Sequence, residues 1–171
     1  MSLKLSAQNR YRAVRLASIG LFFLSSIARA VEVGQQAPDV DLEGAGLPPR
    51  LSQLAGKVVY LDFWASWCAP CRQSFPWMND MHRKYAAKGL KIVGVNLDGD
   101  QDDAEAFMKQ VPTKFAVSFD PKGQSVKGFG IKGMPTAVLI GRDGKILHVQ
   151  LGWRPTDHTK LEAKLAAALS R

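Results

Sequence analysis

Two apolar runs, Lys57–Trp64 and Leu90–Leu97, are rich in β-branched and aromatic residues. Such runs predict strands that are buried on both faces of a sheet. The segment between them, Ala69–Lys88, has helical composition, and Pro76 within it should kink the helix rather than prevent it. A strand, a helix and a second strand of these lengths predict a right-handed βαβ unit with parallel strands.

The second half of the chain predicts a different arrangement. Asp102, three residues before Glu105, predicts the N-terminal cap of a helix that runs to about Gln110. The other predicted elements are a strand or hairpin at Val40–Leu42, a strand at Phe115–Phe119, a helix at Gln124–Phe129, a hairpin of Thr136–Ile140 and Lys145–Leu151, and an amphipathic helix at Thr156–Leu169. A βαβ front and a ββα back predict an α/β fold, with a central mixed β-sheet and helices on both faces.

The first 30 residues have the three-part layout of a secretory signal peptide. A basic region ends at Arg15, an apolar stretch of 12 residues covers Leu16–Ile27, and Ala28-Arg29-Ala30 is typical of a cleavage site. Twelve helical residues reach only ~18 Å, against ~30 Å for the hydrocarbon core, so cleavage after Ala30 is favoured over a retained membrane anchor. We therefore expect a signal peptide at 1–30, one domain at 31–171, and a periplasmic or otherwise extracytoplasmic location.

The charge balance agrees with this division. The chain has 23 Lys and Arg residues against 15 Asp and Glu residues, a formal net charge of +8. Five of the bases and none of the acids fall in 1–30, so 18 bases and 15 acids remain and the domain carries +3. A domain so nearly balanced gives no argument for a nucleic-acid partner.

The chemistry concentrates in the only two cysteines, Cys68 and Cys71, which lie between the first predicted strand and the helix. At a helix N-terminus, free N–H groups and the helix dipole lower a thiol pKa from about 8.5 into the ~3.5–7.5 range. Cys68 is therefore the predicted nucleophile. Cys71, three residues later on the same helix face, is the predicted resolving cysteine, and Pro70 fits the first helical turn.

A structural disulfide and half of a zinc site are the alternatives for this cysteine pair. A disulfide across two intervening residues closes too small a loop to stabilise the chain much by entropy. No second Cys or His pair stands at zinc-ligand spacing. The predicted centre is therefore a redox-active Cys68–Cys71 disulfide, with no metal and no cofactor.

These residues resemble the thioredoxin superfamily, in particular its secreted TlpA/ResA/CcmG-like thiol-disulfide oxidoreductases. The resemblance covers essentially all of 34–169, and its most specific stretches are Leu61–Cys71 (LDFWASWCAPC), Pro76 and Gly133–Thr136 (GMPT). It implies a thioredoxin fold for 31–171.

The resemblance also implies how substrates bind. It implies a cis peptide bond before Pro135, which would pack against the disulfide and present the backbone of Met134 for pairing with a substrate chain. Together with Trp67, Ala69 and Pro70 beside the cysteines, Met134 and Pro135 are the expected substrate contacts.

Two positions depart from the family pattern. Ser74 stands where secreted members often have a glutamate, and Gly94 stands where thioredoxin has the lysine that partners a buried aspartate. Asp62 matches that aspartate. Burial should raise its pKa, so we expect Asp62 to exchange a proton with Cys71 as a proton shuttle. The alternative is a buried aspartate that only bonds local backbone.

The predicted function is an extracytoplasmic thiol-disulfide oxidoreductase that acts on proteins. Ala69 and Pro70 between the cysteines lack the histidine that stabilises the thiolate in oxidising DsbA-type proteins, so a reductant is favoured. By resemblance, the substrates would be cysteines of apocytochrome c or of copper sites. The electron donor would be a membrane protein of the DsbD/CcdA kind, and the chain itself would contact the membrane only if residues 1–30 are retained.

A copper-binding or copper-delivery module on the same scaffold is the competing function. Such modules usually have a CxxxC spacing or distant His or Met ligands, whereas this chain has CxxC and Met134 is the one suggestive soft donor. A peroxiredoxin-type enzyme is disfavoured because Ala65 stands three residues before Cys68, where such enzymes have threonine.

The remaining features favour structural roles. Alternating carboxylates in Asp98–Asp103 resemble the start of a calcium loop, but position six is not glycine and position twelve is Lys109, so a solvated loop before a helix cap is favoured. The three histidines are not spaced as a metal site. Trp153 is left open between a partner surface and a cap on the core.

Overall fold

A computed structural model describes residues 30–171 of the chain. The predicted signal peptide at 1–30 lies outside the described residues except for Ala30. In the described part, no helix combines the length and the apolar character needed to cross a membrane.

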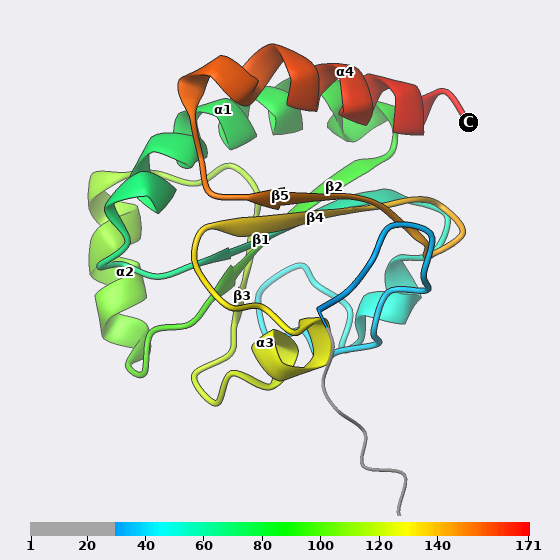
Figure 1. Cartoon of the computed structure of the whole chain (residues 1–171). Helices are drawn as coiled ribbons and strands as arrows, with labels where there is room; N and C mark the ends of the chain where they lie inside the picture. The colour runs from blue at the N-terminus through cyan, green and yellow to red at the C-terminus, as the bar shows by residue number, and fades with distance from the viewer. Residues whose placement is uncertain (1–29) are drawn as a thin grey trace, which may run out of the picture.

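Five strands form one mixed sheet in the order β3-β2-β1-β4-β5 (Figure 1). The strands are β1 Val58–Trp64, β2 Leu90–Asn96, β3 Ala116–Phe119, β4 Thr136–Ile140 and β5 Ile146–Leu151. β1 is parallel to β2, and β2 is parallel to β3, whereas β4 is antiparallel to both β1 and β5. The predicted parallel βαβ unit and the predicted hairpin are therefore confirmed. β1 takes the central position because every residue of its VVYLDFW run is buried.

The described chain has four α-helices, α1 Ala69–Tyr85, α2 Gln101–Gln110, α3 Gln124–Phe129 and α4 His158–Leu169. Three short 3₁₀-helices accompany them, η1 Leu51–Leu54, η2 Ala86–Lys88 and η3 Pro155–Asp157. α1 and α4 lie side by side on one face of the sheet, and α3 covers the other face (Figure 1). The α/β fold with helices on both faces is thus confirmed, and the helix predicted over 69–88 is α1 followed by η2.

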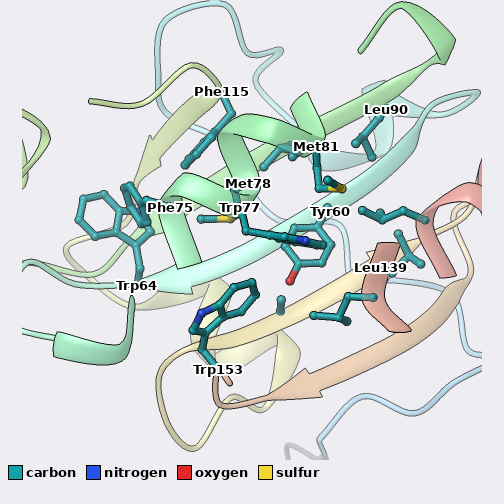
Figure 2. Close-up of a cluster of buried hydrophobic side chains, with 14 of the residues drawn as sticks. Tyr60, Trp64, Phe75, Trp77, Met78, Met81, Leu90, Phe115, Leu139 and Trp153 are labelled. Atoms are coloured by element: carbon teal, nitrogen blue, oxygen red, sulfur yellow. The ribbon is translucent and has the colours of Figure 1, made fainter. Parts of the chain in front are cut away.

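Side chains of β1 alternate between two hydrophobic cores. Tyr60 and Trp64 belong to the core under α1 and α4, whereas Phe63 belongs to the opposite core with Phe129 of α3. Figure 2 shows the first core, a layer of aromatic and thioether side chains between α1 and the sheet. Because alternate residues of a strand share a face, Asp62 lies on the face of Tyr60 and Trp64, toward α1.

Trp153 caps this first core. Its side chain is 8% exposed, and its ring centroid lies 5.2 Å from that of Trp77 and 4.8 Å from that of His158. Such distances are typical of packed aromatic pairs. Figure 2 shows Trp153 in this core together with Trp77. The structure therefore places Trp153 in the core, between α1 and the start of α4.

The predicted start of α2 is wrong by two residues. Asp100, not Asp102, is the N-cap, because Asp100 has an extended backbone and its Oδ1 accepts from the N–H of Asp102 at 3.0 Å. Asp102 and Asp103 instead lie in the first turn, where carboxylates interact favourably with the helix dipole. Several acids in a row offer alternative caps, and the backbone turn decides which one is used.

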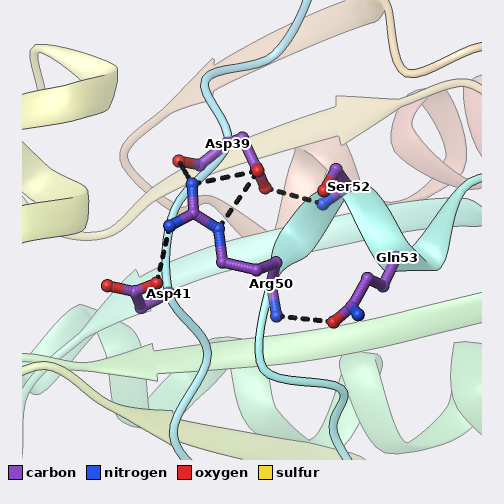
Figure 3. A network of polar contacts seen from close by, with 5 residues as sticks. All are labelled: Asp39, Asp41, Arg50, Ser52 and Gln53. Atoms are coloured by element: carbon purple, nitrogen blue, oxygen red, sulfur yellow. Dashed lines mark hydrogen bonds and ion pairs between the residues drawn. The ribbon is translucent and has the colours of Figure 1, made fainter.

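The segment before β1 is held by polar contacts around Arg50 (Figure 3). Its guanidinium contacts the carboxylates of Asp39 and Asp41, each at 2.9 Å. The N–H of Ser52 donates to Asp39 at 2.9 Å, and this backbone hydrogen bond is the main cause that lowers the pKa of Asp39. The strand or hairpin predicted at Val40–Leu42 is reduced to one isolated antiparallel bridge between Asp41 and Arg50.

Candidate active site

Cys68 and Cys71 form a disulfide where the loop after β1 enters α1. Their Cα atoms are 5.3 Å apart. Cys71 is fully buried, whereas Cys68 is 5% exposed and the preceding Trp67 is 72% exposed. Cys68 is therefore the more accessible of the two cysteines, and it adjoins a large apolar side chain that faces solvent.

The start of α1 places Cys68 at the N-cap, as the sequence predicts. The Sγ of Cys68 accepts from the backbone N–H of Cys71 at 3.3 Å, and Pro70 lies in the first turn, where its missing N–H has no intrahelical partner to lose. No acidic residue lies in this turn. A sulfur at this position faces free N–H groups and the positive end of the helix dipole, an environment that favours an anion.

Ser74 lies one turn after Cys71 and is fully buried. Its hydroxyl donates to the carbonyl oxygen of Cys71 at 2.9 Å. The buried hydroxyl of Ser74 is therefore hydrogen-bonded within α1, at a position where secreted members of the resembled family often have a carboxylate.

The Met134–Pro135 peptide bond is cis, as the resemblance implies. Thr136, the next residue, pairs with Phe63 across the sheet, so Pro135 lies at the edge where β1 leads toward Cys68. Met134 is half-buried and packs against the core that contains both cysteines. The predicted substrate contacts therefore lie at the start of α1 and just before β4, which are both at the end of the sheet where β1 finishes.

Asp62 is a buried carboxylate in the centre of the sheet. It is 2% exposed and lies between Gly94 of β2 and Ala137 of β4. Within the described residues its Oδ2 has no hydrogen-bond partner. Burial raises the pKa of Asp62 from 3.8 to about 8, and the burial and negative charge around Tyr60 raise the pKa of that hydroxyl as well. The carboxyl therefore titrates close to neutral pH.

Packing explains why Asp62 has no lysine partner. A Cβ atom at Gly94 would lie 3.0 Å from Nε1 of Trp64 and 3.1 Å from Cε2 of Phe115. The indole of Trp64 occupies the space that a side chain at 94 would need. Burial is accordingly the cause of the raised pKa of Asp62, and no cation among residues 30–171 opposes it.

Asp98 is a residue that the sequence reasoning missed. The solvated loop predicted for Asp98–Asp103 is wrong at its first position, since Asp98 is only 4% exposed. Its carboxylate accepts from both the N–H and the hydroxyl of Ser66, at 2.9 and 3.0 Å, and from the amide of Asn96 at 2.7 Å. Asp98 follows β2 and Ser66 follows β1. Because neighbouring parallel strands end side by side, the predicted βαβ unit was the signal that these two residues could meet.

No group of three or more His, Cys, Asp or Glu side chains within residues 30–171 could hold a metal ion. The three histidines of the chain do not contribute to such a group. His158 packs instead against the rings of Trp153 and Trp77.

Comparison with known proteins agrees with this geometry. The Redoxin family model matches residues 32–166. The thiol-disulfide oxidoreductase ResA of Bacillus thuringiensis subsp. konkukian is 38% identical over 120 residues, which cover 68% of each chain. ResA of Bacillus subtilis is 34% identical over 124 residues, which cover 72% of this chain and 69% of that protein.

A solved structure gives the same relationship. The crystal structure of a protein from Chlorobium tepidum, described as a thiol:disulfide interchange protein DsbE, superimposes with a TM-score of 0.79 and 54% sequence identity. The match covers 82% of this chain and 99% of that one. The mixed sheet and its flanking helices are therefore those of the thioredoxin fold.

Proposed function

The chain belongs to the Redoxin family and is a ResA/DsbE-like thiol-disulfide oxidoreductase, and on that premise we propose that it reduces protein disulfides outside the cytoplasm. One observation carries this proposal. The more accessible sulfur, that of Cys68, lies at a helix N-cap and accepts from the N–H of Cys71, next in sequence to an exposed tryptophan, and Met134 of the cis peptide packs against the core that contains both cysteines.

The reaction is a pair of thiol-disulfide exchanges. In the reduced protein, the thiolate of Cys68 attacks one sulfur of the substrate disulfide, and the other substrate sulfur leaves and takes up a proton. Cys71 then loses its proton and attacks the Sγ of Cys68. The second substrate sulfur leaves as a thiolate and takes up a proton from solvent, so two electrons have passed to the substrate and the Cys68–Cys71 disulfide remains.

Asp62 serves as the proton shuttle in this scheme. The ionised form of the Asp62 carboxyl accepts the proton of Cys71 when the disulfide forms. With its pKa near 8 in the disulfide form, the carboxyl is mostly protonated at neutral pH and can return a proton to Cys71 when a donor opens the disulfide. The raised pKa and the unpartnered Oδ2 support this role over that of a backbone-bonding aspartate.

Substrate binds at the edge of the sheet around the disulfide. Trp67 supplies exposed apolar surface, Ala69 and Pro70 lie at the start of α1, and Met134, before the cis-proline, offers its backbone for strand-like pairing with a substrate chain. A substrate polypeptide that pairs with Met134 brings its own disulfide toward Cys68.

The direction of electron flow has a direct test. Ala69 and Pro70 place no histidine between the cysteines, which supports a low reduction potential. Equilibration of the domain with glutathione and dithiothreitol buffers should give a potential well below that of DsbA. A reduction potential of about −120 mV would overturn the assignment as a reductant.

The partners and the location follow from the same proposal. Substrates are cysteines of apocytochrome c or of copper sites, the donor is a membrane protein of the DsbD/CcdA kind, and 1–30 exports the chain. A Cys71→Ala variant cannot resolve the mixed disulfide, so expression in the native host should trap substrates on Cys68, with Cys68→Ala as the control. Trapped proteins that are all cytoplasmic would contradict the location, and no trapped protein would contradict the exchange mechanism.

A further inference from the structure

We propose that Asp98 is a positioning residue for this reaction, because it clamps the loop that presents Trp67, next to the nucleophile Cys68, to protein substrates. The proposal rests on the function proposed above. It concerns the four residues from 65 to 68 that connect β1 with α1.

The clamp joins two elements that are distant in sequence. Asp98 follows β2, whereas Ser66 is 32 positions earlier and lies in the loop after β1. Oδ2 of Asp98 accepts from the backbone N–H of Ser66 at 2.9 Å, and Oδ1 accepts from the Ser66 hydroxyl at 3.0 Å. One carboxylate therefore holds both polar groups that Ser66 can donate.

Asp98 is itself fixed by hydrogen bonds to Asn96 at the end of β2. The side-chain amide of Asn96 donates to Oδ2 at 2.7 Å, and the N–H of Asp98 donates back to Oδ1 of Asn96 at 3.2 Å. Asn96 is 1% exposed and ends β2. The carboxylate thus has a rigid base in the sheet, which is the arrangement that fixes a functional side chain accurately.

The loop of residues 65–68 depends on Asp98 because the side chain of Trp67 in this loop has few contacts of its own. The N–H of Cys68 donates to the carbonyl of Ala65 at 3.1 Å, a contact within the loop itself. Trp67 projects into solvent at 72% exposure, between Ser66 and Cys68. Fixing Ser66 therefore limits where the indole of Trp67 can lie, whereas the sulfur of Cys68 is held separately by the start of α1.

A buried carboxylate with only neutral partners destabilises a fold unless its hydrogen bonds are complete. Three donors satisfy Asp98, and two of them belong to the residue next to Trp67. The carboxylate thus holds the active-site loop rather than the core, and we expect its loss to be felt in substrate binding.

Two variants separate positioning from charge. Asp98→Ala removes the clamp. In Asp98→Asn, the amide oxygen in place of Oδ2 still accepts from Ser66 and Asn96, and the amide N–H can donate to the Ser66 hydroxyl, so the clamp survives without its charge. Ser66→Ala removes one of the two loop contacts and is a milder variant should Asp98→Ala fail to fold.

The assay compares a protein disulfide with a small one. Asp98→Ala should raise KM for insulin reduction by about tenfold, within the ~100-fold that a small misplacement can cost. Its reaction with oxidised glutathione, which is too small to use Trp67, should stay within about twofold of the wild type. Ser66→Ala should lie between, and Asp98→Asn should match the wild type. Leu165→Ala, a core change in α4, controls for lost stability and should leave KM unchanged.

A double-mutant cycle with Trp67→Ala tests the route of the effect. If Asp98 acts through Trp67, its removal should add little to the KM of Trp67→Ala. The proposal is overturned by an unchanged KM in both Asp98→Ala and Ser66→Ala, by an Asp98→Asn variant as impaired as Asp98→Ala, or by fully additive effects in the cycle. A wild-type protein that reduces no insulin would instead overturn the proposed function.

Discussion

Replacement of Asp62 by asparagine should change how stability depends on pH. The carboxyl ionises near pH 3.8 in an unfolded chain and near pH 8 in the folded disulfide form. Between these values the folded state keeps a proton that the unfolded state has lost, so raising the pH favours unfolding. The slope is about 1.4 kcal/mol per pH unit, which amounts to about 4 kcal/mol between pH 4 and pH 7, and it ends above pH 8.

The measurement is urea unfolding of the oxidised protein from about pH 4 to about pH 9, for the wild type and Asp62→Asn. In the oxidised protein neither cysteine titrates, so the thiols do not contribute. The wild type should lose stability steadily up to about pH 8, and the variant should lack this loss. Comparing slopes rather than single values removes any fixed cost of burying the asparagine amide.

Other groups do not imitate this result. Burial lowers the pKa of His148, which makes stability rise with pH near neutrality, but His148 is present in both proteins and cancels in the difference. Parallel stability curves for the two proteins would refute the argument that burial keeps Asp62 protonated. The rate at which a small thiol reduces the Cys68–Cys71 disulfide gives a second readout. Its dependence on pH should show an inflection near pH 8 in the wild type and none in Asp62→Asn.

The other predictions concern packing and exposure. Gly94→Ala should destabilise the fold by about 1–3 kcal/mol in urea, since its Cβ would crowd Trp64 and Phe115; an unaffected midpoint would show that these rings move aside at no cost. Trp153→Ala should cost about 3–5 kcal/mol, because the side chain is 8% exposed. Trp67→Ala should cost less than about 0.5 kcal/mol at 72% exposure while raising KM for insulin. Equal losses for the two tryptophan variants would contradict their placement.

Local sequence was enough to locate the five strands of the sheet, the four α-helices and the redox pair, although it also predicted a strand or hairpin at Val40–Leu42 that is only an isolated bridge. The runs that became β1 and β2 are mostly apolar and rich in β-branched and aromatic residues, and the hairpin has a turn between two such runs, so each element is specified by its own residues. Cys68 and Cys71 are placed by the same local rule, because a strand followed by a helix fixes where the helix N-terminus falls. The cis bond before Pro135 came from family resemblance instead.

Local sequence was not enough where several segments compete for one place. Asp100 and Asp102 are both good caps, and only the path of the loop selects Asp100. Asp98 looks like a solvated acid beside other acids, yet the sheet brings it onto Ser66. Trp153 could face solvent or the core until Trp77 and His158 are seen against it.

The sequence by itself determined the main elements, the CxxC centre and the buried position of Asp62, because the hydrophobic period and the burial of a strand are properties of short segments. Only the tertiary structure decided that Trp64 fills the space at Gly94, where a lysine partner of Asp62 would otherwise stand, and that Asp98 contacts the loop before the nucleophile. Both depend on side chains from neighbouring parallel strands, and their meeting is fixed by sheet order and register rather than by any local pattern.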